Sequence, residues 1–516
     1  MTKTRSPIDR GVLGTRKLLD RLTGRVTMYR LVTLLLSVVA AAAILLSAVG
    51  ALPWAPVDLI ASLAVGIAAT VVSGRIAALI LRSRPHLESS VITGLLIFFL
   101  FWPSSEPAEL GVIALAGALA TASKYLIAWR GRHILNPTAA GSTLVALLLL
   151  PSAVWWVASA ALLPFVLVGA FLVLYRTRRL AMGTAFVAVS AGILLVRLVA
   201  GGQAPLDAFA TVFTSYPILF FAGFMLSEPL TMPPRRWQQL GIAVVVGVLF
   251  TIPFSFPPVF LSFEFALVLG NALAFLAGQR RRIRLVFLDR RQLTPTAWEF
   301  RFRPDHPVAF RSGQYMELTI PHGRTDARGS RRIFSISSAP GPDAPVTFSM
   351  RLPAATEKAS SFKRALLKLS PGSRIDGTSV GGDFLLPKSP DRPVLLVAGG
   401  IGITPFLSQL EHDRLSGTTR DVVLVYAVGS LEELAFREDL AAEKVLLVSP
   451  RAPDDLPPSW RWVGSAITAE LLEAEVPDLA TRATFVSGSP AMVESAKSEL
   501  RHAGARRVST DHFAGY

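Results

Sequence analysis

The sequence predicts a multi-span α-helical membrane domain of about ten helices, followed by an antiparallel β-barrel and an α/β domain. Composition is the first reason: 51% of the 516 residues are hydrophobic and only 17% are charged, which is too apolar for an ordinary soluble enzyme. The second is a shift along the chain, because apolar runs fill residues 31–277 and charged, turn-rich sequence follows Arg280. The third is the strand pattern, which changes from alternating to continuously apolar at Arg392.

These shifts divide the chain into four expected parts. They are a basic cytoplasmic arm over 1–28, a polytopic membrane domain over 29–279, a β-barrel over 283–388 and an α/β domain over 389–516. The arm precedes the first apolar run and has no small-residue cleavage site after a short hydrophobic region. It therefore reads as a retained segment and not as a signal peptide.

Basic residues alternate between successive loops of the membrane domain. At about 20 residues per crossing, residues 31–277 hold roughly ten spans. Loops on one side carry Lys and Arg: Arg82, Arg84, Lys124, Arg130, Arg132, Arg176, Arg178, Arg179, Arg235, Arg236, Arg280, Arg281, Arg282 and Arg284. The intervening loops, such as "WPSSEPAE" and "AGGQAPLDAF", carry none. The positive-inside rule then places both the arm and the C-terminal half in the cytoplasm of a bacterial cell.

The charge and cysteine content exclude several classes of site. The net charge is +16, but basic residues cluster at the ends of apolar runs, so we expect no nucleic-acid partner. The chain contains no cysteine, which excludes disulfides, thiolate metal sites and ordinary cysteine-ligated iron–sulfur clusters. Redox chemistry would need an organic cofactor or haem, and no metal site is predicted.

Polar residues inside the expected spans are candidates for function, since burying them in lipid is costly. Glu264 and Asn271 lie seven positions apart, on one face of the last span. Helix-to-helix hydrogen bonding is the alternative reading, and the preferred one for Asn271. Glu88, Asn136 and Glu228 fall near span ends, where solvation or capping explains them.

Four segments of the membrane domain carry a resemblance: "ESSVITGLLIFFLFWP", "GRHILNPTAAG", "FMLSEPLTMPP" and "FALVLGNALAFL". In this order they resemble membrane subunits B and D of the sodium-pumping NADH:quinone reductase and Rnf complexes. The resemblance implies a flavin in the membrane, commonly FMN esterified to a threonine. Here the nearest match to that motif is "LDAFAT", ending at Thr211, without the serine or glycine context. The resemblance therefore leaves a non-covalent FMN or riboflavin, or a quinone, as the expected occupant.

The stretch "RRIFSISSAP" is the first candidate site of the C-terminal half, among short alternating runs that predict a small antiparallel barrel. On a strand, Arg332, Phe334 and Ile336 face one way and Ser335 the other. A guanidinium can bind phosphate, an aromatic ring can cover a flavin and a hydroxyl can reach a ring nitrogen. Ordinary packing on an edge strand is the alternative.

Two further turns suit phosphate groups. In "EKASSFKRALLKL", Lys358, Ala359, Ser360 and Ser361 open a helix, where free amides and hydroxyls can seat a pyrophosphate; a plain serine N-cap is the alternative. In "LLVAGGIGITPFLSQL" a strand ends in glycines before a helix that begins near Pro405. Glycines allow a phosphate to approach the backbone closely.

These motifs, with "FVSGSPAMV", resemble the ferredoxin–NADP reductase superfamily across residues 283–516. The resemblance implies a barrel that binds FAD and an α/β domain that binds NAD(P)H. Arg332 and Ser360 or Ser361 would hold the FAD pyrophosphate, Phe334 would pack on the isoalloxazine, and Ser335 would bond near its N5. The remaining cofactor-binding residues implied are Ser338, Lys358, Gly399, Gly400, Gly402, Pro405, Gly488 and Pro490.

The same resemblance implies catalytic roles for Ser335, Ser487 and Tyr516. Ser487 stands where many members have a cysteine, so somewhat slower hydride transfer is expected. Tyr516, in "STDHFAGY", would shield the flavin; a frayed terminus is the alternative. The choice between NADH and NADPH stays open, with Ser430 and Arg437 as candidate contacts to a 2′-phosphate.

The sequence favours a membrane-bound flavoprotein that takes a hydride from cytosolic NAD(P)H and passes electrons to the membrane domain. Its expected partners are the lipid bilayer and a quinone, a flavin or a redox protein as acceptor, with ion coupling open. One alternative is a haem-linked ferric reductase or NADPH oxidase type, which needs paired histidines; the membrane half offers His86 and His133, both near span ends. The other is a redox-sensing transporter, with Glu264 as its coupling residue.

Overall fold

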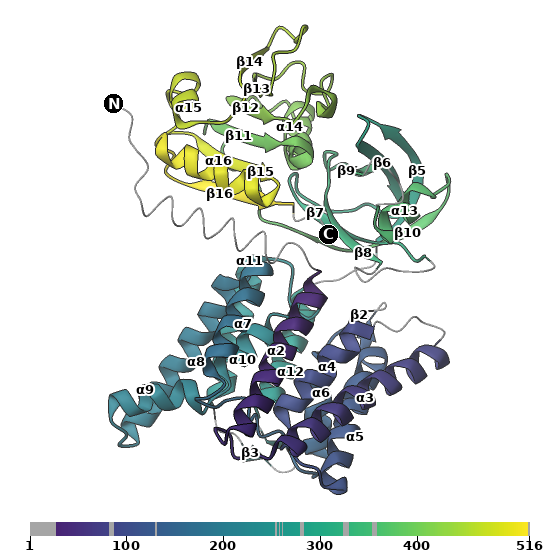
Figure 1. The fold of residues 1–516 in the computed structure, drawn as a ribbon. Helices are drawn as coiled ribbons and strands as arrows, with labels where there is room; N and C mark the ends of the chain where they lie inside the picture. Colours follow the sequence, from purple (N-terminus) through teal and green to yellow (C-terminus); the bar gives the residue numbers. More distant parts are fainter. Residues whose placement is uncertain are drawn as a thin grey trace. The chain divides into compact units, whose positions relative to one another are not determined.

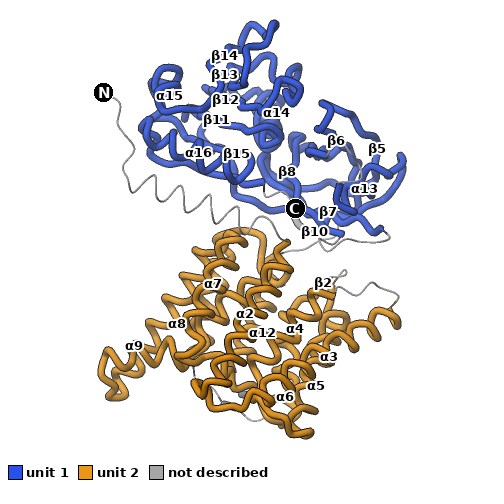
Figure 2. Tube along the Cα trace, viewed as in Figure 1, with its two compact units in different colours: residues 1–21, 280–516 blue, residues 22–279 orange. Residues whose placement is uncertain are grey.

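The chain divides into two units in the computed structural model (Figure 2). We call Leu22–Gln279 the helical unit, and the unit that contains Arg280–Tyr516 the sheet unit. The structure describes residues 27–81, 87–129, 132–252, 255–256, 259–260, 262–278, 283–322, 330–352 and 359–513. Of the residues singled out above, Arg82, Arg84, His86, Arg130, Arg280, Arg281, Arg282, Lys358 and Tyr516 lie outside the described residues, as does most of the basic arm. The four-part division of the chain stays a prediction.

Helices make up most of the helical unit (Figure 1). They are α2 (Met28–Ala48), α3 (Pro56–Ile80), α4 (Leu87–Leu100), α5 (Pro107–Leu126), α6 (Pro137–Leu147), α7 (Leu163–Arg176), α8 (Leu180–Ala200), α9 (Pro205–Thr214), α10 (Ile218–Phe220), the π-helix η1 (Phe221–Leu226), α11 (Arg236–Thr251) and α12 (Phe263–Ala277). Two-residue strands β1 (Ala128–Trp129), β2 (Arg132–His133), β3 (Ser255–Phe256) and β4 (Val259–Phe260) form two small hairpins.

Four of the described helices are long and apolar enough to cross a membrane: α2, α3, α5 and α8. A fifth crossing is available if α9 and the segment Ile218–Leu226, bent by 47° at their junction, count as one. Helices α4, α7, α11 and α12 are apolar but shorter. A helical region with candidate apolar spans is thus confirmed, while its place in a membrane and the ten crossings stay predictions.

Local sequence explains where these helices begin and how closely they pack. Proline occupies the first turn of α3, α5 and α6, where its missing N–H costs nothing. Asn136 caps α6 by accepting a hydrogen bond from the Ala139 amide. A Cβ at Gly94 would lie 2.7 Å from the Ile67 Cα, so only glycine allows α3 and α4 this contact.

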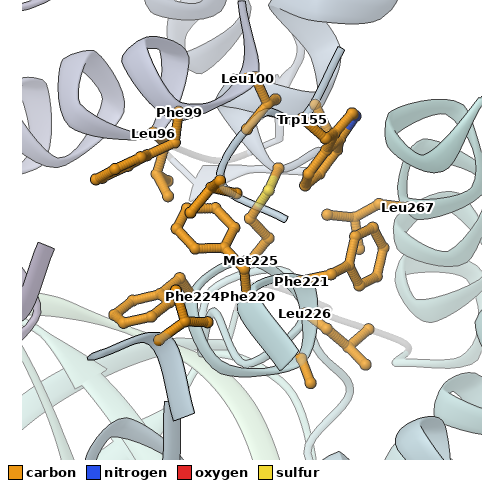
Figure 3. Packing of buried hydrophobic residues seen from close by; sticks show 14 of the residues in the cluster. Leu96, Phe99, Leu100, Trp155, Phe220, Phe221, Phe224, Met225, Leu226 and Leu267 are labelled. Carbon is orange, nitrogen blue, oxygen red and sulfur yellow. The ribbon is translucent and has the colours of Figure 1, made fainter. Parts of the chain in front are cut away.

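Aromatic side chains fill the centre of the helical unit. Phe99, Phe220 and Phe221 are fully buried, and Figure 3 shows them with Trp155 around a common core. Phe221 stacks on Phe186 with ring centroids 5.0 Å apart. Such rings stabilise the core through their large contact area and through stacked or edge-to-face packing with one another.

The first sheet of the sheet unit is antiparallel, as predicted. Its strands are β5 (Ile283–Gln292), β6 (Ala297–Pro304), β7 (Tyr315–Thr319), β8 (Arg331–Ser335), β9 (Val346–Arg351) and β10 (Arg374–Gly381), in the order β8-β7-β10-β5-β6-β9. Helix α13 (Ser361–Leu367) packs against the same core. An isolated bridge from Ile336 to Phe348 joins the chain after β8 to β9. Full closure into a barrel stays a prediction.

The second sheet is parallel, as predicted. Its strands are β11 (Val394–Gly399), β12 (Val422–Ala427), β13 (Val445–Val448), β14 (Trp460–Gly464), β15 (Ala483–Gly488) and β16 (Val508–His512), in the order β14-β13-β12-β11-β15-β16. Its helices are α14 (Thr404–Leu415), α15 (Ala469–Glu475) and α16 (Pro490–His502).

Both faces of the parallel sheet are covered, which explains its continuously apolar strands. Leu396 and Ala398 of β11 pack with residues of α14, whereas Leu395 and Val397 pack with residues of α15 and α16. Because β11 pairs with β12 on one side and β15 on the other, strand order reverses there. Ligands of open α/β sheets bind at the carboxyl ends of strands beside such a reversal.

Candidate functional site

A cavity of about 1080 Å³ lies between the two sheets of the sheet unit. Strands β8 and β9 contribute one wall, and the carboxyl ends of β11, β12 and β15 contribute the other. Residues from both predicted motifs, "RRIFSISSAP" and "GGIGITP", therefore meet at one cavity. The sequence predicted each motif separately, and the tertiary structure brings them together.

Strand β8 presents Arg332, Phe334 and Ser335 to the cavity. Arg332 is buried and its guanidinium carbon lies 5.5 Å from the centroid of the Phe362 ring. The Phe334 ring packs on the same Phe362, at 5.8 Å between centroids. Phe362 of α13 thus orients both side chains. Ser335 lines the cavity despite its alternate position, and so does Ile333 on the same face of β8.

Three serines that the sequence predicted to bind a cofactor make contacts within the protein. Ser338 Oγ accepts a hydrogen bond from the Thr347 amide at 3.1 Å, and its carbonyl accepts one from Ser408 Oγ at 2.7 Å. Ser360 caps α13 by accepting from the Lys363 amide at 3.3 Å, and Ser361 is buried beside it. None of the three lines the cavity, although Lys363 does. The N-cap alternative describes Ser360, and its cofactor role stays a prediction.

The glycines after β11 have different physical roles. A Cβ at Gly402 would lie 2.5 Å from the Ser487 carbonyl oxygen and 2.6 Å from the Gly488 Cα, so Gly402 lets the ends of β11 and β15 touch. Gly400 has φ +52° and open space where a Cβ would stand, and it lines the cavity together with Gly399. Pro405 is buried in α14 and does not line the cavity.

At the end of β15, Ser487 is fully buried and its Oγ has no hydrogen-bond partner among the described residues. Ser489 begins α16 by capping it, accepting from the Met492 amide at 3.4 Å. Ser489 and Pro490 line the cavity, whereas Ser487 and Gly488 lie behind them. Such a hydroxyl is unusual, because buried polar side-chain atoms in folded proteins nearly always have a hydrogen-bond partner.

Asp511 is a cavity residue that the sequence interpretation missed. It lies on β16 in register with Ser487, and it lines the cavity. Burial raises the pKa of Asp511 to about 6, with a further rise from the charge of Asp383, against the lowering effect of the His512 backbone. A carboxyl with that pKa can give up or take a proton near neutral pH. In the sequence, the only sign of this site was that "STDHFAGY" contains one acidic residue, Asp511.

Glu433 is a second missed residue. It follows β12, lines the cavity and forms an ion pair with Arg351 of β9, which also lines it. The two side chains named for a 2′-phosphate are engaged elsewhere: Arg437 donates to Asp455 Oδ2 at 2.7 Å, and Ser430 Oγ donates to Glu432 Oε2 at 3.4 Å. Among the residues that the structure describes after β12, Glu433 therefore places a carboxylate at the cavity.

The polar residues of the helical unit form a separate network. Asn271 Oδ1 accepts a hydrogen bond from the Asn136 amide at 2.7 Å, as the helix-to-helix interpretation expected. Asn136 Nδ2 donates to Glu228 Oε2 at 3.0 Å, and His133 Nε2 lies 2.7 Å from the other Glu228 oxygen. The described residues contain no group of three or more His, Asp and Glu suited to a metal ion.

Part of the chain that forms this site is similar to known proteins. Residues 396–498 match the family described as oxidoreductase NAD-binding domain. The flavohemoprotein of Deinococcus radiodurans is 27% identical over 214 residues, covering 39% of this chain and 51% of that protein. The 2-halobenzoate 1,2-dioxygenase electron transfer component of Burkholderia cepacia is 34% identical over 151 residues, covering 28% and 41% respectively.

The chain spans about half the length of such curated relatives. Among solved structures, a ferredoxin NADP+ reductase from Neisseria gonorrhoeae with bound FAD and NADP is 22% identical; it covers 45% of this chain and 99% of its own, with a TM-score of 0.38. The match of residues 396–498 to an NAD-binding domain supports nucleotide binding by this region. The resemblance of the helical unit to the membrane subunits stays a prediction.

Proposed function

We propose that this protein is a membrane-bound NAD(P)H oxidoreductase, which takes a hydride from cytosolic NAD(P)H onto FAD in the sheet unit and passes electrons to an acceptor at the helical unit. One observation carries the proposal: a single cavity is lined by Arg332, Phe334 and Ser335 from one sheet and by Gly399–Gly402 at the switch point of the other. The match of residues 396–498 to oxidoreductase NAD-binding domains supports it.

The cavity walls fit a flavin dinucleotide chemically. Arg332 supplies a fixed guanidinium suited to a pyrophosphate, with Ser360 or Ser361 at the start of α13 as its proposed companion. Phe334 is half-buried against Phe362 and offers an aromatic face to a ring system. When bound, FAD supplies the hydride and single-electron chemistry that no side chain can provide.

The remaining residues position the nicotinamide nucleotide and handle its protons. Gly399 and Gly400 let the nucleotide approach the backbone at the end of β11, since neither carries a side chain toward the cavity. The Ser487 hydroxyl has hydrogen-bonding capacity to spare but does not line the cavity, so the contact with nicotinamide that the resemblance implies for it stays a prediction. Asp511 exchanges a proton near its pKa of about 6 and so balances charge that arrives in the cavity.

We further propose NADH as the preferred donor. Glu433 lines the cavity at the loop after β12, where its carboxylate is paired with Arg351. Such a carboxylate accepts a hydrogen bond from the ribose 2′-hydroxyl, whereas a 2′-phosphate would compete with it for Arg351. Arg437, the candidate partner for a phosphate, is held by Asp455. Both features favour NADH over NADPH, which carries the 2′-phosphate.

The acceptor is proposed to be a quinone, a membrane flavin (FMN or riboflavin) or a redox protein. The apolar helices α2, α3, α5 and α8 are compatible with a membrane anchor. The basic loops support a cytoplasmic sheet unit, on the side of the NAD(P)H pool. The competing redox-sensing transporter would bind the nucleotide without sustained turnover, so added quinone or flavin distinguishes the two.

The deciding experiment is the visible spectrum of purified full-length protein, with the flavin-to-protein ratio, before and after anaerobic NADH or NADPH. Bleaching of bound flavin on adding NADH supports the proposal. A ratio above one FAD per chain would place a second flavin outside the sheet unit. A haem band, or bound flavin that neither nucleotide reduces, would overturn it.

A further inference from the structure

Glu264 is a buried carboxyl inside the helical unit that the reductase function does not use. It is 1% exposed in the first turn of α12. Its Oε2 accepts a hydrogen bond from Trp155 Nε1 at 3.0 Å. Its Oε1 is buried and accepts no hydrogen bond of ordinary geometry among the described residues, and the Ser262 hydroxyl is a further polar neighbour of the carboxyl. One oxygen is thus held by a donor while the other is left with unused capacity.

Aromatic rings surround the Trp155 indole that holds this carboxyl. Its ring centroid lies 5.8 Å from that of Phe221, 5.9 Å from that of Phe263 and 6.5 Å from that of Phe220. Figure 3 shows Trp155 facing the same core as Phe221 and Leu267, which lies one turn along α12 from Glu264. The environment has a low dielectric constant, which disfavours an ionised carboxylate.

No cation described nearby offsets a negative charge on Glu264. Helix α6, which packs on α12, has no charged residue, and neither does the segment 251–263 that precedes Glu264. Helix α11 carries its one charged residue, Arg236, at the end remote from Thr251. Arg197 of α8 reaches that end, where it donates to the Thr251 carbonyl, and it forms no ion pair with Glu264 among the described residues. An ion at Glu264 would therefore be buried without a paired charge.

The surrounding backbone is irregular at the same place. Helix α9 ends and α10 begins with a 47° bend, and the π-helix η1 follows directly. Tyr216, at the bend, lies 6.4 Å from Phe263 between ring centroids. Trp155 has φ +55°, a left-handed conformation that a bulky residue rarely adopts. Broken helices and strained residues inside membrane domains gather at sites where ions or substrates bind.

We propose that Glu264 is a proton-exchange site of the helical unit. An indole N–H can only donate, so Trp155 occupies Oε2 and the carboxyl proton resides on Oε1. In the resting protein the group is a neutral acid. On release the Oε1–H bond breaks and a new O–H bond forms on a water molecule, which carries the positive charge away and leaves the carboxylate with the electron pair. Uptake is the reverse of this step. The proposal does not depend on the reductase function.

Infrared spectroscopy of purified full-length protein at neutral pH tests this directly. A protonated carboxylic acid has a C=O stretching band distinct from that of a carboxylate. We expect this band in the native-minus-Glu264→Gln difference spectrum, and a shift of the band after transfer to D₂O. The matched control is Glu106→Gln, which alters an exposed glutamate at the start of α5 and should produce no such band.

Trp155→Phe provides a second test that does not require Glu264→Gln to fold. Loss of the indole donor should move the carboxylic C=O band to higher frequency, because one hydrogen bond to Oε2 is lost. Absence of the Glu264 band at neutral pH, or a band unmoved by Trp155→Phe, would overturn the proposal. A band that persists but never shifts in D₂O would also overturn it, because the proton would then not exchange.

Discussion

Replacing Gly402 with alanine tests whether the ends of β11 and β15 must touch for the site to form. The new Cβ would lie 2.5 Å from the Ser487 carbonyl oxygen and 2.6 Å from the Gly488 Cα. Both are backbone atoms, so relief requires the turn after β11 to move away from β15. Overpacking of this kind costs about 1–3 kcal/mol, which at about 2–4 °C per kcal/mol lowers the Tm of the sheet unit by about 2–12 °C.

The expected functional result is slower flavin reduction by NADH, because the displaced turn no longer seats the nucleotide. Flavin fluorescence on heating follows unfolding of the sheet unit, and stopped-flow absorbance follows reduction. Gly429→Ala is the matched control: Gly429 also lines the cavity, but its Cβ would have as its neighbour Glu433 Oε2 at 3.4 Å, an ordinary contact. A Gly402→Ala protein that melts and is reduced like the Gly429→Ala protein would refute the reasoning.

Three further predictions concern the same cavity. The raised pKa of Asp511 means that the folded protein binds the carboxyl proton more tightly than the unfolded chain does. The stabilising effect of this proton is therefore complete below pH 3.8 and is lost as pH rises through about 6. In denaturant titrations, Asp511→Asn should flatten the fall in unfolding free energy over this pH window. Arg332→Gln should weaken FAD binding by about 10- to 100-fold, since hydrogen bonds to charged groups contribute about 1.5–3 kcal/mol; equilibrium dialysis measures it, and unchanged flavin retention would contradict the assignment, with exposed Arg303→Gln as control. Glu433→Ser should raise kcat/KM for NADPH relative to NADH by about tenfold, in line with the loss of one like-charge contact. Steady-state kinetics with both nucleotides measures this ratio, and an unchanged ratio would contradict the assignment of Glu433.

Local patterns in the sequence were enough to predict the division into an apolar helical part and two kinds of sheet. The continuous apolar run at Val394–Gly399 predicts a strand buried on both faces, and the structure confirms a parallel sheet covered on both sides. The alternating run at Arg331–Ser335 predicts a strand of the antiparallel sheet, which is also confirmed. Span counting was less informative, because several apolar helices are shorter than one crossing.

The candidate site was predicted in part. Arg332, Phe334, Ser335, Gly399, Gly400 and Gly402 line the cavity, whereas the predicted Gly488 and Pro405 do not. Ser338 does not, because its hydroxyl satisfies a backbone amide of the neighbouring strand. A serine in a turn has the same sequence signature in either role, and its partner is decided by what packs beside it.

The sequence by itself determined which segments prefer lipid, which form strands and which turns can approach a phosphate, because hydrophobicity, periodicity and glycine content are local properties. Tertiary structure alone decided which segments meet. It placed Asp511 beside Ser487 in register on adjacent strands, Glu433 on Arg351 of β9, and Trp155 on Glu264, 109 residues further along the chain. Such contacts depend on packing between distant elements, and it is packing that buries a carboxyl and thereby changes its affinity for a proton.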